Sequence, residues 1–414
     1  MTKAPTVGDD GPTAEAFAKE AEAFLAANAE LRPRGRASFG DGSDEILLIP
    51  ERTAAEQERA VADAKRWAGV VFDAGLGWIT GPRRYGGREL PMSFQRTYDA
   101  IEAAYETPNQ APRAIGIGMV APTILAHGTE VVKERYLRGL HRGDIVACQL
   151  FSEPAAGSDL ASLTTRAVQD GEEWVISGQK VWTSGASYAD IGEILCRTDS
   201  ELEKHRGITA FVLDMHTAGI EVRPLRQMTG GSSFNEVFLS EVRVPADHLL
   251  GELNGGWAVA LTTLMNERAA IGGGSASVPV DEALDRLIEL SHQLGATRSP
   301  LVRQELADLY IRVRVARHTN DRALARLRAG QPPGPELSIA KLALTENLSR
   351  IAAVAAHVLG ARLIADSSDW GTYAWAPFVL GVPGIRVAGG TDEIMRNIIG
   401  ERVLGLPKEP QPNR

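Results

Sequence analysis

Two periodicities of hydrophobic and polar residues divide the chain into three regions. From about residue 12 to 145, Ala and Leu recur at three- and four-residue spacing with Glu and Lys between them, as in amphipathic helices. From about 146 to 250, short stretches rich in Val, Ile, Phe and Thr, several of them alternating, are separated by Gly-containing turns, which predicts β-strands. From Gly255 onward the helical spacing returns in long segments with short joints.

The order helical, β, helical predicts an α+β protein with three domains. We place an N-terminal helical domain at 1–146, a middle domain at 147–250 and a C-terminal helical domain at 251–414. The middle domain is predicted to be an antiparallel sheet or small barrel, because its strands do not alternate with helices. Long helices with short connections predict an antiparallel bundle in the last domain.

The segment GIGMVA at 116–121 has the glycine spacing of a dinucleotide-binding fingerprint. That motif requires a strand before it and a βαβ unit around it, and this segment lies in a helical region. We therefore interpret its glycines as helix-packing residues.

Composition and charge narrow the classes of function. Of the 414 residues, 44% are hydrophobic and 23% charged, as in ordinary globular proteins. A net charge of −9 disfavours nucleic-acid binding, and no apolar run approaches the length of a membrane span. The start of the chain lacks the pattern of a signal peptide, and Cys148 and Cys196 have neither a pairing pattern nor metal-ligand spacing. We expect a cytoplasmic protein without a metal site.

One carboxylate lies on an otherwise apolar helical stripe. Ala260, Leu264 and Ile271 are spaced to share one helix face, and Glu267 is the fourth member of that line. A buried charge is costly unless it is paired or used. The adjacent Arg268 leaves two interpretations open, a structural ion pair or a functional carboxylate.

Two segments of the β-rich region have the residue types of a ligand site. CQLFSEPAAGSDLASL, 148–163, is rich in small and hydroxyl residues, which lets backbone N–H groups approach a flat polar ligand. In GQKVWTSGASYAD, 178–190, a Trp precedes Thr and Ser at a strand end. Alone, each could be an ordinary loop or a core tryptophan. Together they predict a site for an extended aromatic cofactor with hydrogen-bonding edges.

The sequence resembles the acyl-CoA dehydrogenase family over nearly its whole length. The resemblance rests on YGG near residue 85, FSEPAAGSD, GQKVWTSG, FNEVFLSEVRVP and the terminal GGTDEIMRNIIGERVLGLP, in that order. It implies an N-terminal helical domain, a middle β-barrel domain and a C-terminal four-helix bundle. It also implies FAD bound between the last two domains, an acyl-CoA substrate, a homotetramer or a heteromeric assembly, and electron-transfer flavoprotein as the acceptor.

The resemblance also assigns residues to the cofactor and the substrate. For FAD it implies flavin contacts from Phe151, Ser152, Trp182, Thr183 and Ser184, adenosine-end contacts from Thr391, Asp392 and Glu393, and a contact to a neighbouring subunit's FAD from Gln304. His357 and Gly360 stand where the family has a Gln-x-x-Gly-Gly segment, and Arg298 is the nearest candidate for the arginine that precedes it. For the substrate, it implies Ser158, Leu264 and Asn266.

The catalytic base is the main departure from the family pattern. Most members carry a glutamate directly before the Gly-Thr of the C-terminal motif, and this chain has Gly389 there. Isovaleryl- and long-chain-type members instead use a Glu-Arg step on a bundle helix, which matches Glu267 and Arg268. The resemblance therefore implies that Glu267 removes the α-proton and that Arg268 orients the pocket. The backbone N–H of Gly389 could still polarise the thioester carbonyl.

These residues favour an FAD-dependent acyl-CoA dehydrogenase, but other functions on the same scaffold stay open. A non-catalytic subunit of a heteromeric dehydrogenase would lack the base, so Glu267 argues against it. An oxidase or monooxygenase on the same scaffold is hardly separated by sequence. A DNA-binding flavoprotein of this fold is disfavoured by the acidic balance. The chain length, branching or ring content of the acyl group cannot be read from the sequence.

Overall fold

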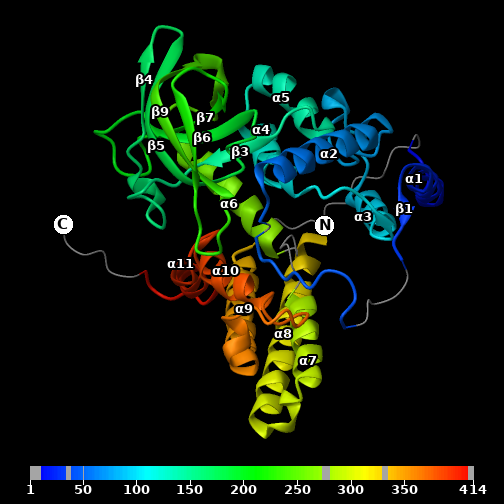
Figure 1. Cartoon of the computed structure of the whole chain (residues 1–414). Helices are drawn as coiled ribbons and strands as arrows, with labels where there is room; N and C mark the ends of the chain where they lie inside the picture. Colours follow the sequence, from blue (N-terminus) through cyan, green and yellow to red (C-terminus); the bar gives the residue numbers. More distant parts are fainter. Residues whose placement is uncertain (1–10, 34–38, 50, 273–279, 329–333, 409–414) are drawn as a thin grey trace.

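The computed structural model describes residues 11–33, 39–49, 51–272, 280–328 and 334–408. The N-terminal helices and a β-sheet lie side by side, and a helical bundle projects from beneath them (Figure 1). Helix α6, Gly256–Gly272, runs from the sheet to the bundle. The predicted order of three domains is confirmed.

The N-terminal domain is built from short helices that begin at threonine caps. Its helices are α1 Ala14–Asn28, α2 Ala54–Asp73, α3 Met92–Glu102, α4 Ala121–His127 and α5 Glu130–Arg142, with a two-strand ladder of β1 Glu30–Leu31 and β2 Tyr105–Glu106. At α2, Thr53 and Glu56 form a capping box in which each side chain accepts from the other's backbone N–H. The predicted packing glycines at 116 and 118 lie in η3, a π-helical turn at Gly116–Val120 directly before α4.

The middle domain is a sheet of eight strands. The strands are β3 Ala147–Leu150, β4 Arg166–Asp170, β5 Glu173–Ser184, β6 Ile191–Arg197, β7 Ile208–Asp214, β8 Ile220–Leu225, β9 Phe234–Pro245 and β10 Leu249–Leu250. They follow the order β10-β7-β6-β4-β5-β9-β8, and β3 also pairs with β6. One face packs against α4 and α6, while an apolar cluster around Trp174 and Phe211 fills the other side.

The predicted barrel is wrong in one respect, because the sheet is not closed. Across the middle domain, all of whose residues are described, the end strands β10 and β8 do not pair with each other. The two halves of the sheet meet at a single bridge, Arg166 to Arg197 between β4 and β6. The β3–β6 pair is parallel, which local alternation does not reveal.

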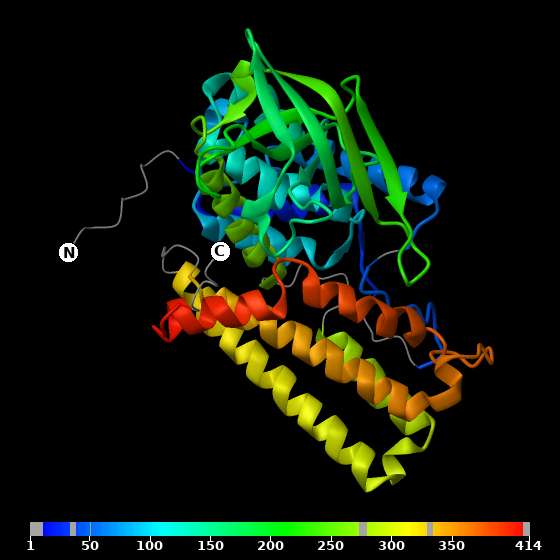
Figure 2. The ribbon, with the colours of Figure 1, turned by 90° about the vertical axis from the view of Figure 1, so that its left-hand side faces the viewer.

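The C-terminal domain is a bundle of α7 Val280–Gln293, α8 Pro300–Arg328, α9 Leu337–Leu359 and α10 Trp375–Val387. Helix α9 packs against α6, α7, α8, α10 and α11, the last at Asp392–Ile398. Figure 2 shows α10 and α11 on the side of the bundle that faces the sheet, while the α7–α8 turn lies at the far end. The predicted helical bundle is confirmed.

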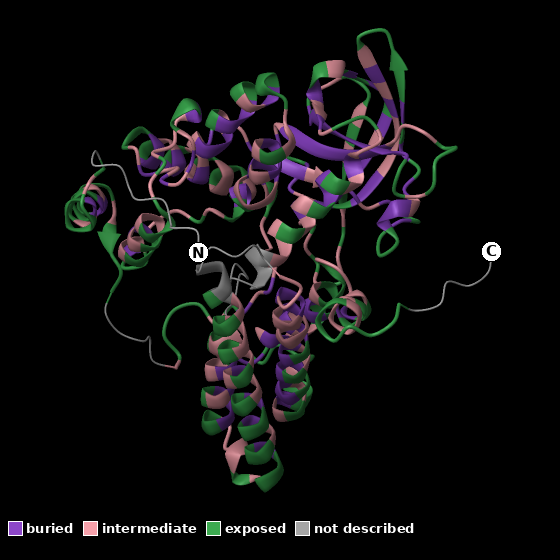
Figure 3. Cartoon of the chain, turned by 180° about the vertical axis from the view of Figure 1, so that it is seen from behind, coloured by how far each residue is buried: buried purple, intermediate pink, exposed green. Residues whose placement is uncertain are grey.

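Burial follows this division into domains. Buried residues gather inside each domain, and the outer faces of the bundle are exposed (Figure 3). Several exposed side chains of α8 are large and apolar, namely Leu301, Tyr310, Ile311 and Val315. No helix in the described part of the chain combines the length and apolar character needed to cross a bilayer.

Candidate functional site

The end of strand β5 displays an aromatic ring. Trp182 has a φ of 61°, in the left-handed region that non-glycine residues seldom adopt, and its side chain is 61% exposed. The pairing of β5 with β9 shifts register between Lys180 and Thr183, so a bulge turns Trp182 out of the strand alternation. The indole and the Phe234 ring lie edge to face, with their ring centroids 6.1 Å apart. A strained, exposed Trp at a bulge is suited to stacking on a ligand.

Two buried polar atoms on the residues that follow Trp182 and Phe234 in sequence have no hydrogen-bond partner among the described residues. They are Thr183 Oγ1 and Asn235 Oδ1, on side chains that are 1% and 2% exposed. The two residues are register partners on β5 and β9. Buried polar atoms are nearly always satisfied, so these two indicate a missing partner. The Trp182 ring and these atoms fit a flat aromatic group with polar edges.

A buried ion pair fixes the loop after β3. Lys180 Nζ lies 2.9 Å from Glu153 Oε1 and donates to the Phe151 carbonyl at 3.1 Å, while the Glu153 carboxylate also accepts from Thr164 and Thr165. Burial raises the pKa of Glu153, but Lys180 and these hydrogen bonds outweigh it and hold the pKa at about 2. The sequence did not predict this pair. It joins the two predicted ligand-site segments, and a backbone hydrogen bond from Val181 N to the Ser152 carbonyl at 2.8 Å joins them as well. Phe151 is buried, Ser152 and Ser184 are partly buried, and Ser158 is exposed.

Helix α6 presents Glu267 and Arg268 near the bundle. Glu267 is partly buried, and burial raises the pKa of its carboxyl against the opposing charges of Arg268 and Lys341. Arg268 makes no ion pair with Glu267 within 4.0 Å in the described residues. Leu264 packs on the apolar cluster beneath the sheet, and Asn266 is partly buried. The side chain of Ile271, the last residue of the stripe, lies outside the described residues.

The turn before α11 is held by a buried lysine. Gly389 and Gly390 have φ values of 65° and 90°, which glycine adopts without strain. Lys341 Nζ donates to the Gly390 carbonyl at 2.7 Å, and Lys341 also acts on the pKa of Glu267 through its charge. This lysine therefore connects the glycine turn with the region of α6 that carries the carboxylate.

The residues after that turn form the start of α11. Thr391 caps the helix by accepting from Ile394 N. Asp392 is buried and accepts from Thr345 and Arg386, each at 2.7 Å, so its carboxylate is occupied within the chain. Glu393 is exposed.

Four predicted residues lie together at the end of the bundle remote from the sheet. Arg298 and Gln304 are exposed near the start of α8, and Gly360 follows the end of α9 with a φ of 53°. His357 Nδ1 lies 2.8 Å from Glu305 Oε2. Figure 2 shows this end of the bundle pointing away from the sheet. Of these four residues, the resemblance implied a contact to a neighbouring subunit's FAD for Gln304 alone.

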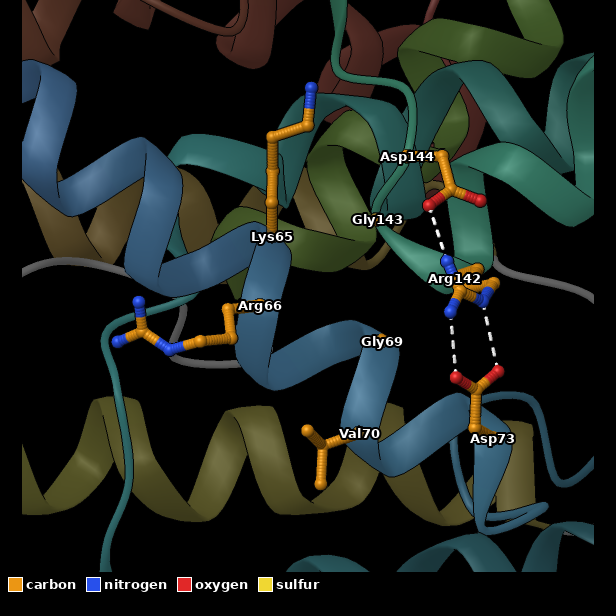
Figure 4. Close-up of a pocket in the computed structure, with 8 residues that line it drawn as sticks. All are labelled: Lys65, Arg66, Gly69, Val70, Asp73, Arg142, Gly143 and Asp144. Atoms are coloured by element: carbon orange, nitrogen blue, oxygen red, sulfur yellow. Dashed lines mark hydrogen bonds and ion pairs between the residues drawn. The ribbon is translucent and has the colours of Figure 1, made fainter.

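A surface pocket of about 500 Å³ lies elsewhere, between α2 and the end of α5 (Figure 4). Its side chains are already paired, since Arg142 binds Asp73 and Asp144. Among the described residues, no group of three His, Cys, Asp or Glu side chains could hold a metal ion.

Comparisons with known proteins agree across the chain. Family models of the acyl-CoA dehydrogenase N-terminal, middle and C-terminal domains match residues 45–144, 148–242 and 254–404. Acyl-CoA dehydrogenase IpdE1 of Mycobacterium tuberculosis is 34% identical over 355 residues, which is 85% of this chain and 90% of IpdE1. FadE34 of the same organism is 38% identical over 369 residues, 87% of this chain, but the chain spans only 49% of FadE34.

Solved structures resemble the whole chain. The Tcur3481-Tcur3483 steroid ACAD has a TM-score of 0.72 at 28% identity, covering 95% of this chain and 97% of that one. The ChsE4-ChsE5 complex of Mycobacterium tuberculosis gives 0.71 at 27% identity, covering 98% and 100%. The chain therefore belongs to the acyl-CoA dehydrogenase family, whose members are FAD-dependent flavoprotein oxidoreductases.

Proposed function

We propose that this chain binds FAD and removes two hydrogens from the α and β carbons of an acyl-CoA thioester, with Glu267 as the base. The observation that carries the proposal is a partly buried carboxylate on α6, with a raised pKa, in a chain whose C-terminal turn offers only Gly389. Anaerobic titration of the purified flavoprotein with a panel of acyl-CoAs tests it. Bleaching of the flavin absorbance supports the proposal, and no bleaching by any member of a broad panel opposes it.

The chain's own residues have distinct tasks in this reaction. The Glu267 carboxylate takes the proton from Cα, and the electron pair of that bond forms the Cα–Cβ double bond. In this proposal the N–H of Gly389 donates to the thioester oxygen, which acidifies the α-proton. Trp182 covers the flat cofactor, and the unpaired Thr183 hydroxyl meets its polar edge. When bound, FAD supplies the acceptor for the hydride that leaves Cβ.

Arg268 is proposed to tune Glu267. Its positive charge lowers the pKa of the carboxyl, so Arg268→Gln should raise that pKa and move the rising limb of the kcat–pH profile to higher pH. The rate should fall most on the acid side, where the unprotonated base is scarce. Arg268→Lys keeps the charge and is the control. An unshifted limb in Arg268→Gln would argue that Arg268 does not act on the base.

The Thr183 hydroxyl is proposed to form a hydrogen bond with the bound cofactor. Thr183→Val removes a group without a partner in the described chain, so thermal stability of the apoprotein should not fall while FAD affinity drops about tenfold. Thr209→Val is the matched control, because Thr209 Oγ1 is buried and accepts from Asn254 N at 2.9 Å. That variant should lose stability and keep FAD affinity. Equal FAD affinity in Thr183→Val and wild type would show that the Thr183 hydroxyl does not bind the cofactor.

The acyl group is proposed to carry rings. Relatives include a steroid ACAD and a cyclohexane-1-carbonyl-CoA dehydrogenase of Geobacter metallireducens, 29% identical over 336 residues. The titration panel should therefore compare steroid and alicyclic acyl-CoAs with straight chains. Preference for the straight chains by kcat/KM would reject this choice.

The assembly is proposed to be oligomeric, with electron-transfer flavoprotein as the electron acceptor. Similar structures include the ChsE4-ChsE5 complex, and the exposed apolar side chains of α8 offer a surface for a second subunit. The alternative of a base-lacking partner subunit predicts that the purified chain is not bleached until a second chain is added. The oxidase alternative predicts rapid reoxidation of the reduced flavin by air.

A further inference from the structure

A second carboxylate, Glu193, is enclosed in the apolar cluster between the sheet and the helices. It lies on β6 with an exposed fraction of 0%. Its strand neighbours on the same face, Ile191 and Leu195, belong to the cluster that α4 and α6 complete. An ionised carboxylate without a cation is very unfavourable in such a place.

Its hydrogen bonds form a chain that crosses three elements. Thr263 Oγ1 of α6 lies 2.6 Å from Glu193 Oε1 and 2.9 Å from Thr123 Oγ1 of α4. The Thr123 hydroxyl in turn donates to the carbonyl of Met119, in the π-helical turn η3, at 2.8 Å. The sheet, α6, α4 and η3 are thereby joined by polar contacts inside an apolar core.

The number of protons that the hydrogen-bonded network needs indicates whether the Glu193 carboxyl is protonated. Three short oxygen–oxygen contacts require three protons, and the two threonine hydroxyls supply one each. If Thr263 donated to an ionised Glu193, or to the Val259 carbonyl of its own helix at 3.3 Å, the 2.9 Å contact between the two threonines would hold no proton, because Thr123 donates to the Met119 carbonyl. A protonated carboxyl completes all three short contacts, with Glu193 donating to Thr263, Thr263 to Thr123, and Thr123 to the Met119 carbonyl. The pKa of Glu193 agrees, since burial raises it to about 8 against the effect of Thr263.

The position of Thr263 links this network to the proposed base. Thr263 precedes Glu267 by four residues on α6, about one helical turn on the same side. Apolar packing is non-directional, whereas a hydrogen bond fixes the rotation of a helix about its axis. We infer that Glu193 is a positioning residue, which through Thr263 holds α6 at the rotation that points Glu267 into the acyl site. This inference rests on the proposed function.

Few other titratable groups lie on the elements around Glu193. On α6 they are Glu267 and Arg268, one turn beyond Thr263, and on α4 the single one is His127, which contacts Thr262 at 2.8 Å instead. The described η3 turn has none, and the register partners of Glu193 on β3 and β7 are uncharged. When the acid ionises, the third proton leaves and the network loses one of its contacts.

Four variants of the holoenzyme test this role by kcat and KM between about pH 6 and pH 9, a range centred near the pKa of Glu193. Wild type should lose kcat as pH rises past about 8, and Glu193→Gln, which keeps a donor but cannot ionise, should not. Glu193→Leu and Thr263→Val should lower kcat about tenfold or more with KM little changed. Thr263→Ser should restore kcat, because it restores the hydroxyl.

The melting temperature provides a second test that does not depend on the activity of variants that fold poorly. The protonated native state loses its advantage as pH rises from the ordinary value of 4.5 to about 8, so the melting temperature of Glu193→Gln relative to wild type should rise across that window and level off above it. The inference is overturned if Glu193→Gln shares the alkaline fall in kcat, or if Thr263→Val keeps wild-type kcat. Bleaching of Glu267→Gln at the wild-type rate would instead reject the proposed base, whatever the Glu193 variants do.

Discussion

Glu267→Gln is expected to keep FAD bound and to slow flavin reduction by acyl-CoA about a thousandfold. Glutamine occupies the same space but cannot accept the α-proton at neutral pH. Position 389 is a glycine and offers no carboxylate, and the nearby Asp392 is already bound to Thr345 and Arg386. The measurement is the rate of anaerobic flavin bleaching in a stopped-flow instrument, after the visible spectrum has shown that each preparation holds its flavin.

Glu289→Gln is the matched control, because Glu289 is an exposed helical glutamate on α7. It should bleach as wild type does. Reduction of Glu267→Gln at the wild-type rate would show that another group takes the proton. A wild-type chain that no acyl-CoA bleaches, but that bleaches with a second chain, would support the partner-subunit alternative.

The sequence predicted local features of the fold better than long-range pairing. Helices such as α2 were predictable from the three- and four-residue spacing of their Ala and Leu residues. Strand direction was not predictable, because β3 pairs in parallel with β6 across about 40 residues of chain. Closure of the sheet depends on whether β10 reaches β8, and no local pattern records that.

The same distinction applies to the site. Residue types and order predicted the segment around Trp182, but its left-handed φ and exposure depend on the register shift against β9. The Lys180–Glu153 pair spans 27 residues and becomes visible only when β5 packs on the loop after β3. Glu193 had one signal in the sequence, a lone acidic residue in the strand IGEILCR, and a single residue of this kind has no predictable partner.

Lys180→Met is expected to destabilise the middle domain by about 3–5 kcal/mol, since it leaves the Glu153 carboxylate buried without its cation. Lys180 and Glu153 side chains are 0% and 4% exposed, so water cannot take over the role of the lysine. The loop after β3 should loosen and FAD should dissociate more readily. Lys204→Met is the matched control, because Lys204, between β6 and β7, forms an exposed pair at 2.6 Å with Asp159 of the loop after β3, and it should cost under about 1 kcal/mol. Urea denaturation followed by circular dichroism measures both variants.

The pH dependence of Lys180→Met identifies the cause of this loss. In wild type the pKa of Glu153 is held at about 2, so its stabilisation is complete above the ordinary value of 4.5 and is lost only as pH falls toward 2. Without Lys180, burial becomes the dominant influence and the pKa should rise above its ordinary value. Acidification then protonates Glu153 in the folded state and should recover part of the lost stability. The urea midpoint of Lys180→Met should therefore approach that of wild type between pH 7 and about pH 5. A constant gap over this range would mean that lost packing of the lysine stem, rather than an unpaired carboxylate, weakens the domain.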